Sequence, residues 1–94
     1  MINMITITTE QVTKTNGVYN LEVTKEDNEI VAVKAVVTAQ IHKENGLGGY
    51  ILSAKVGTIE QNGKGTSITG EIPSDVLPDV ISEFNEIVNN LNNN

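Results

Sequence analysis

The chain has 94 residues, a formal net charge of −6, no cysteine, and six basic residues, all lysine. This length fits one domain and is too short for two. The lack of cysteine excludes disulfides and thiolate metal sites. Arginine makes the bidentate contacts to phosphate and guanine, so an acidic chain without it argues against direct nucleic-acid binding.

The N-terminal residues contain neither a basic segment followed by an apolar one nor a run of roughly 20 apolar residues that a membrane helix needs. We therefore expect a soluble, cytoplasmic protein without a membrane partner. Lysine without arginine, together with abundant asparagine and isoleucine, is what AT-rich codons encode. This composition fits an AT-rich bacterial or phage genome, and a phage-encoded product would lie in the host cytoplasm or the virion.

The first two predicted elements are strands joined by a tight turn. Ile5 and Ile7 alternate with threonines, which is typical of a half-buried strand ending near residue 14. Asn16-Gly17 supplies two residues that tolerate positive φ, as a type I′ hairpin turn requires. The second strand then places three apolar residues on the same face as Val12: Tyr19, Leu21 and Val23. Because Ile5 and Ile7 have the opposite parity, either a bulge switches the face or the first strand serves both faces.

The third predicted strand, residues 30–43, has the clearest alternation in the chain. Its odd positions are all apolar and predict one buried face: Val31, Val33, Ala35, Val37, Ala39 and Ile41. A fourth strand over 50–60 and a fifth over 66–72 follow, separated by glycine-containing turns. Since no helical pattern lies between the strands, the order predicts an antiparallel meander.

The last predicted element is an amphipathic helix. The segment 73–75 offers an N-cap, Pro78 suits the first turn, and one apolar stripe follows: Leu77, Val80, Ile81, Phe84, Ile87, Val88 and Leu91. The expected fold is α+β, a five-stranded antiparallel β-meander packed against one C-terminal amphipathic helix. Residues 1–91 form this single domain, and residues 92–94 form a frayed polar tail.

The chain offers no assembled set of catalytic or metal-binding residues. His42 is the only histidine, and a general base or a zinc site needs partners that it lacks. The glycines at 63 and 65 precede a predicted strand rather than a helix, so they do not form a phosphate-binding loop. We expect no catalytic residue, cofactor or metal. If the protein were an enzyme, the place to look would be near His42, Glu44 and Tyr50. A small-molecule ligand between helix and sheet stays an open alternative.

Three surfaces are candidates for contacts with a partner. One helix cannot cover both faces of the sheet, so apolar residues expected on the far face form a candidate interface: Ile30, Ala32, Val36, Ile51 and Ile59. The helix and its start carry a candidate acidic contact face: Asp75, Asp79, Glu83 and Glu86. The glycine-rich connection after the third strand gives a candidate contact loop: His42, Asn45, Leu47 and Tyr50.

These observations favour a non-catalytic protein–protein interaction or assembly protein that associates with itself through the sheet. A phage or mobile-element accessory protein fits the composition. The alternative is an inhibitor of a host defence or nucleic-acid enzyme, in which the acidic helix imitates a phosphate backbone and occupies a basic groove. The two hypotheses differ in the expected partner, which is a second copy of the chain or a basic protein.

Overall fold

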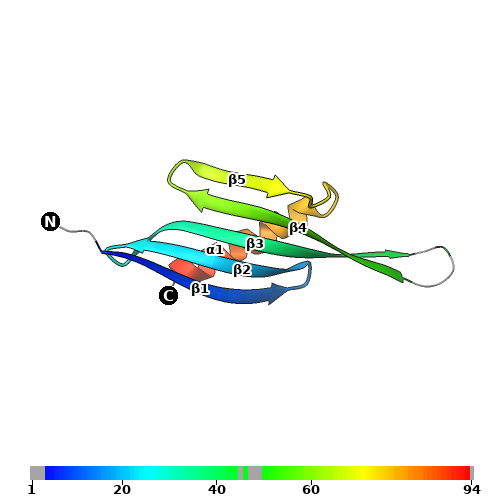
Figure 1. Cartoon of the computed structure of the whole chain (residues 1–94), viewed down its shortest axis with the longest axis horizontal. Helices are drawn as coiled ribbons and strands as arrows, with labels where there is room; N and C mark the ends of the chain where they lie inside the picture. The colour runs from blue at the N-terminus through cyan, green and yellow to red at the C-terminus, as the bar shows by residue number, and fades with distance from the viewer. Residues whose placement is uncertain (1–3, 45, 47–49, 94) are drawn as a thin grey trace.

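The computed structural model describes residues 4–44, 46 and 50–93. It contains one antiparallel sheet in the order β1-β2-β3-β4-β5 and a single C-terminal helix (Figure 1). The elements are β1 (Ile5–Lys14), β2 (Gly17–Glu26), β3 (Glu29–Glu44), β4 (Tyr50–Asn62), β5 (Gly65–Gly70) and α1 (Leu77–Asn92). The predicted α+β meander with one helix is therefore confirmed.

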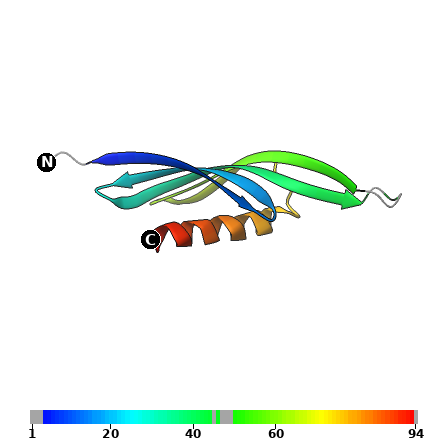
Figure 2. The same cartoon turned by 90° about the horizontal axis from the view of Figure 1, so that it is seen from below.

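The sheet is open, and α1 lies against one of its faces (Figure 2). Strand β5 pairs with β4 and β1 pairs with β2, so β1 and β5 are the two edges and do not pair with each other. Pairing of β3 with β4 continues to Glu44 and Tyr50, whereas β2 follows β3 only to Ala39 and β5 follows β4 only to Gly57. This extended ladder contributes to an elongated shape of 64 × 22 × 17 Å.

The first hairpin turns one residue earlier than Asn16-Gly17 predicts. Lys14 pairs with Gly17, so the turn residues are Thr15 and Asn16, and neither has positive φ. Gly17 belongs to β2 and is buried, with its Cα so close to β3 that a Cβ would stand 3.1 Å from the carbonyl oxygen of Thr38. The close approach to β3, rather than the turn, is therefore what favours a glycine here.

The turn with two positive-φ residues lies between β2 and β3. Asp27 has φ of 52° and Asn28 has φ of 71°, and Glu26 pairs with Glu29 on either side of them. These are the features of a type I′ turn, whose twist matches that of antiparallel strands. Aspartate and asparagine tolerate the left-handed region better than other non-glycine residues, which explains their use here.

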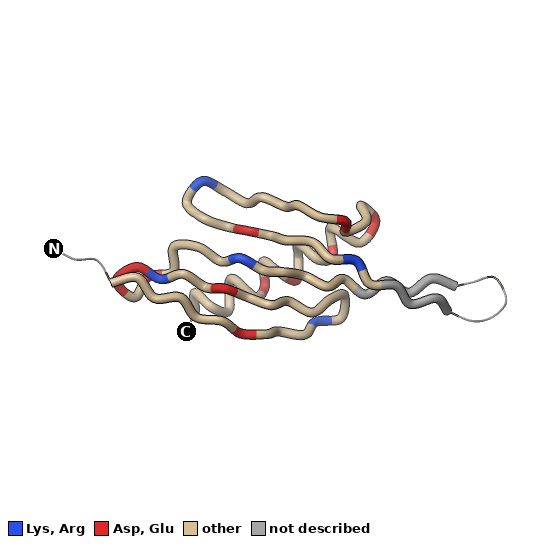
Figure 3. Tube along the Cα trace, viewed as in Figure 1, with Lys and Arg blue, Asp and Glu red and all other residues tan. Residues whose placement is uncertain are grey.

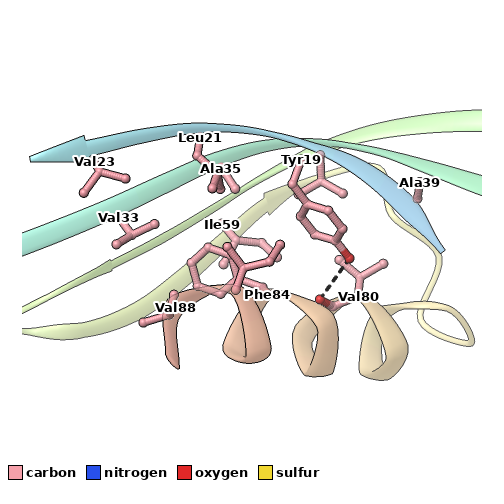
Figure 4. Close-up of a cluster of buried hydrophobic side chains, with 12 residues drawn as sticks. Tyr19, Leu21, Val23, Val33, Ala35, Ala39, Ile59, Val80, Phe84 and Val88 are labelled. Atoms are coloured by element: carbon pink, nitrogen blue, oxygen red, sulfur yellow. Dashed lines mark hydrogen bonds between the residues drawn. The ribbon is translucent and has the colours of Figure 1, made fainter. Parts of the chain in front are cut away.

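The core lies between α1 and the inner face of β2, β3 and β4 (Figure 4). Twelve side chains form it: Tyr19, Leu21, Val23, Val33, Ala35, Val37, Ala39, Ile59, Val80, Phe84, Ile87 and Val88. Val12 of β1 packs against this cluster and pairs with Tyr19. The predicted inner face of β2 is thus confirmed. The helical stripe is confirmed for Val80, Phe84, Ile87, Val88 and Leu91, whereas Leu77 and Ile81 are half-buried and lie outside this cluster. Aliphatic burial of this kind contributes about 25 cal/mol per Å² of apolar surface.

A β-bulge at the start of β3 corrects the predicted positions of two residues. The pairing with β2 shifts between Thr24 and Lys25, so that Ile30 pairs with Lys25, Ala32 pairs with Thr24, and Val31 has no partner in this ladder. The extra residue exchanges the two faces. Val31, expected in the core, is 41% exposed. Ile30, expected on the far face, packs against the core instead.

Strand β4 has the opposite parity from the predicted one. Glu44 pairs with Tyr50 across five intervening residues, so odd residues of β3 face odd residues of β4. Ile59 consequently lies beside Ala35 and is fully buried, although we expected it on the far face. Val56, whose position has the opposite parity from Ile59, lies on the outer face and is 52% exposed. One residue of register exchanges every side chain between faces.

The helix begins two residues after its predicted cap. Val76 occupies the N-cap position and makes no side-chain capping bond, and Pro78 lies in the first turn as expected. The carbonyl oxygen of Pro73 accepts hydrogen bonds from the backbone N–H groups of Val76 and Leu77 at 3.1 and 3.0 Å. The chain from β5 therefore enters the helix through a backbone turn rather than through Ser74 or Asp75. The helix ends at Asn92, one residue beyond the predicted domain end.

Candidate functional site

The outer face of the sheet, opposite α1, carries exposed β-branched apolar side chains. The exposed fractions are 65% for Ile5, 59% for Ile7, 40% for Val36 and 52% for Val56. Cross-strand pairing aligns Ile7 with Thr24 and Ala32, and Val56 with Thr38 and Val18. Of the candidate interface, Ala32 and Val36 lie on this face, Ile30 and Ile59 belong to the core side, and the side chain of Ile51 is outside the described part.

A charged row divides this outer face in two. Lys34 of β3 stands opposite Glu22 of β2 and Glu60 of β4, and the row continues to Thr9 on one side and Ser67 on the other. Opposite charges at directly facing positions stabilise strand pairing. Ile5 and Ile7 lie on one side of the row, and Val36 and Val56 on the other. The apolar side chains are therefore two separate patches, of which one reaches the β1 edge.

The β1 edge is the longest uncovered element of the sheet. Every residue from Ile5 to Gln11 is exposed, and the pairing with β2 has no bulge. The carbonyl oxygen of Met4 accepts a hydrogen bond from the N–H of Asp27 at 2.9 Å. The backbone groups of this even-numbered residue therefore point toward the β2 side. Because ladder bonds alternate along an antiparallel strand, the N–H and C=O groups of Ile5, Ile7 and Thr9 point away from the sheet.

The first half of β1 also lacks the devices that usually protect an edge. Its sequence from Ile5 to Thr9 is Ile-Thr-Ile-Thr-Thr, without charge, proline or glycine, and Figure 3 shows an uncharged trace along this stretch. Natural edges are commonly blunted by lysine, proline, bulges or short length. The opposite edge, β5, is protected because it is short, with only six residues. Sequence reasoning missed the β1 edge, although the alternation of isoleucine and threonine was its signal.

Glu83, a member of the candidate acidic face, is turned toward the sheet. Its Oε1 accepts a hydrogen bond from the hydroxyl of Tyr19 at 2.7 Å, and its Oε2 accepts one from Nδ2 of Asn16 at 3.0 Å. The backbone N–H of Asn16 also donates to both oxygens, at 3.3 and 3.2 Å. This carboxylate therefore links α1 to the β1–β2 turn through hydrogen bonds. Because they involve both the backbone and the side chain of Asn16, they favour a turn at Thr15-Asn16.

Burial raises the pKa of the Tyr19 hydroxyl far above its ordinary value, and the hydrogen bond to Glu83 and the negative charge of that carboxylate raise it further. The phenol consequently stays protonated throughout the physiological range and acts as a donor. Its proton is held between Glu83 and the carbonyl oxygen of Val80, which lies 3.3 Å from the hydroxyl (Figure 4). Such a locked, buried phenol has a structural role rather than that of a proton-transfer group.

The other acidic residues are distributed unevenly around the helix. Glu86 forms an ion pair with Lys14, with 2.6 Å between Oε1 and Nζ. Asp75 precedes the helix and Asp79 lies in its first turn, and both are exposed. Of the four residues, Glu83 and Glu86 thus have donors within the chain. The structure does not align all four carboxylates as one solvent-facing row.

Two members of the candidate contact loop, His42 and Tyr50, lie at the far end of the β3–β4 ladder. Asn45 and Leu47 lie outside the described residues. The backbone of His42 pairs with that of Leu52, and the backbone of Tyr50 pairs with that of Glu44. These positions are beyond the last pairing partners of β2 and β5, at some distance along the strands from the helix-covered core.

An open hollow of about 440 Å³ lies where the C-terminal part of α1 meets the start of β3. Its lining combines apolar and amide side chains and holds no titratable residue: Ile30, Val31, Ala32, Val33, Gln61, Asn62, Gly63, Val88 and Asn92. Within the described part of the chain, no three histidine, cysteine, aspartate or glutamate residues are grouped so that they could hold a metal ion. The hollow therefore offers shape but no acid–base group.

None of the helices in the described ranges has the length and apolar character to cross a membrane. Searches with this chain found no matching family model, no matching curated protein and no matching solved structure.

Proposed function

We propose that this protein is a non-catalytic interaction or assembly protein that associates with itself through its sheet. The observation that carries the proposal is the one-sided architecture, in which α1 covers the inner face while the outer face and both edges stay uncovered. Exposed isoleucine and valine on that outer face, in two patches on either side of the charged row, support a contact role, because exposed apolar patches on small domains commonly mark an interface. A phage or mobile-element accessory protein is the gene context that the lysine-only, asparagine-rich composition favours.

The test is the molar mass in solution, measured by light scattering after size exclusion over a range of protein concentrations. A mass of two or more chains supports the proposal, and a monomer at every concentration refutes self-association. Val36→Lys then probes the outer face, because Val36 is 40% exposed there. Thr66→Lys is its matched control, since Thr66 is exposed and pairs with Gln61 on the helix side of the sheet. Loss of assembly in Val36→Lys alone would locate the contact on the outer face.

The alternative, inhibition of a nucleic-acid enzyme through the acidic helix, has a narrower basis. It rests on Asp75 and Asp79, which are exposed, because Glu83 and Glu86 already accept hydrogen bonds from the sheet side. It predicts a basic partner and binding that weakens steeply with salt. Capture of such a partner by the wild-type chain, and its loss when Asp75 and Asp79 are both replaced by lysine, would favour this alternative over self-association.

A further inference from the structure

Resting on the proposed self-association, we infer that the contact is made by the β1 edge, through antiparallel pairing of Ile5–Thr9 with the same segment of a second copy. The backbone identifies the class of occupant. Ile5, Ile7 and Thr9 direct their N–H and C=O groups away from β2, as the Met4–Asp27 hydrogen bond establishes for the alternating pattern. An extended strand pairs with such a row of groups through main-chain hydrogen bonds, and residues 5–11 are exposed, which leaves the row accessible.

Charge restricts how a second copy pairs with this edge. Each copy carries −6, so two copies approach best where neither presents a carboxylate. A two-fold pairing centred on Glu10 would place the two Glu10 carboxylates face to face, and one centred on Thr9 would place them at diagonal positions. Pairings centred on Ile7 or Thr8 keep the Glu10 carboxylates of the two copies apart. The uncharged half is therefore the part suited to self-pairing.

Hydrophobic contact then favours Ile7 as the centre. A two-fold axis at Ile7 places Ile7 opposite its symmetry mate and Ile5 opposite Thr9, all on the outer face. Four isoleucines, two from each copy, form a continuous row there, whereas a centre at Thr8 sets each Ile7 against a threonine. Threonines 6 and 8 face each other on the helix side, and cross-strand threonine pairs are favourable. About six backbone hydrogen bonds join the copies.

The resulting assembly is a closed dimer with one ten-stranded sheet. The two-fold axis is perpendicular to the sheet, so both copies of α1 lie on the same side. Pairing of β1 with β5 of another copy would instead be a head-to-tail contact that leaves a free edge at each end and grows into a filament. The short β5, six residues flanked by two glycines of positive φ, is the poorer template.

The first experiment blocks the edge without touching the fold. In Ile7→Pro the missing N–H is one that points away from β2, so the β1–β2 ladder keeps its bonds. Two hydrogen bonds at the dimer axis are lost, and the dimer dissociation constant rises by about 100-fold. Thr13→Pro is the matched control, since it lies on the same strand with the same outward N–H but beyond the pairing. Far-UV circular dichroism confirms that both variants are folded.

The second experiment reports the register directly, because the chain has no cysteine of its own. Ile7→Cys places the only thiols of the dimer opposite each other across the axis, at a Cα separation of about 5.5 Å that suits a disulfide. Mild oxidation should give a covalent dimer in Ile7→Cys and none in Thr13→Cys. The charge pair Ile5→Lys with Thr9→Glu should keep the dimer, while Ile5→Glu with Thr9→Glu should dissociate it.

The outcomes separate the two proposals. A dimer that is weakened by Ile7→Pro, unchanged by Thr13→Pro and cross-linked through Ile7→Cys supports the edge contact. An oligomer that persists in Ile7→Pro overturns the edge contact but leaves the proposed self-association standing. Open-ended growth of the wild type also overturns the closed dimer. A wild type that is monomeric at every concentration overturns both.

Discussion

Removal of the Tyr19 hydroxyl should destabilise the protein out of proportion to one atom. In Tyr19→Phe the ring stays in the core, but Glu83 loses the donor that lies 2.7 Å from its Oε1. Hydrogen bonds to charged groups contribute about 1.5–3 kcal/mol. The second contact of the hydroxyl, to the carbonyl of Val80 at 3.3 Å, is long and adds little. We therefore expect the free energy of unfolding to fall by about 1.5–3 kcal/mol.

The measurement is urea unfolding followed by far-UV circular dichroism. For a domain of this size, a loss of 1 kcal/mol corresponds to a melting temperature lower by about 4–8 °C, which provides an independent check. A double-mutant cycle with Glu83→Ala isolates the pair, because Glu83 also accepts from Asn16. Tyr19→Phe should cost much less in the Glu83→Ala background than in the wild type.

The reasoning fails if Tyr19→Phe costs the same with and without Glu83. That result would mean that the Tyr19 hydroxyl is satisfied elsewhere and that its hydrogen bond to Glu83 does not help to hold α1 against the sheet. A loss of less than about 0.5 kcal/mol in the wild type would lead to the same conclusion, since surface substitutions commonly fall within that range.

Three further changes test the fold. Because the pKa of Tyr19 is raised in the folded state, the unfolded chain loses the phenol proton first as the pH rises. The free energy of unfolding should therefore be constant below about pH 10 with respect to this group and decline above it by up to about 1.4 kcal/mol per pH unit. In urea titrations Tyr19→Phe should show a shallower decline with pH, and equal declines in variant and wild type would contradict a raised Tyr19 pKa. Ile59→Ala should cost about 2–5 kcal/mol and the exposed Val56→Ala under about 0.5, and the reverse order would contradict the β4 register. Gly70→Ala should loosen β5 in hydrogen exchange, because the φ of Gly70 is 114° and an added Cβ would clash with the Cα of Gly57. Gly63→Ala should not loosen β5, because an added Cβ there has nothing within 4 Å, and equal protection in the two variants would refute the close approach of Gly70 to Gly57.

Elements with long, regular patterns were predictable from the sequence. The apolar stripe of α1 gave the correct helix face, and the alternation of β3 from Val33 to Ala39 gave the correct inner face. Both signals repeat over several turns or residue pairs, so local exceptions do not change their direction. The β5 strand lacks such a pattern, and it ends at Gly70 rather than at the predicted residue 72.

Registers were not predictable, because each depends on a contact between distant residues. The first turn is displaced by Glu83, which lies 67 positions after Asn16 and binds its backbone and amide. The bulge at Val31 and the odd-to-odd pairing of β3 with β4 each exchange the faces of one or more residues. Ile30 and Ile59 moved from the candidate interface to the core side for these reasons. The candidate interface therefore retained Val36 and Ala32 but lost its largest described members.

The sign of the salt dependence separates the two functional hypotheses without knowledge of the partner. Two copies of charge −6 repel each other at a distance, and salt near 0.1 M screens this repulsion beyond about 10 Å. Since the proposed β1 contact contains no charged residue between Ile5 and Thr9, it has no attractive ion pair for salt to weaken. Dimerisation measured by sedimentation should therefore strengthen modestly from 20 to 300 mM salt, a range of roughly one decade in ionic strength. Binding of a basic protein to Asp75 and Asp79 would weaken over the same range. Self-association that weakens with salt would thus contradict an uncharged edge contact, even if the mass of the complex were that of a dimer.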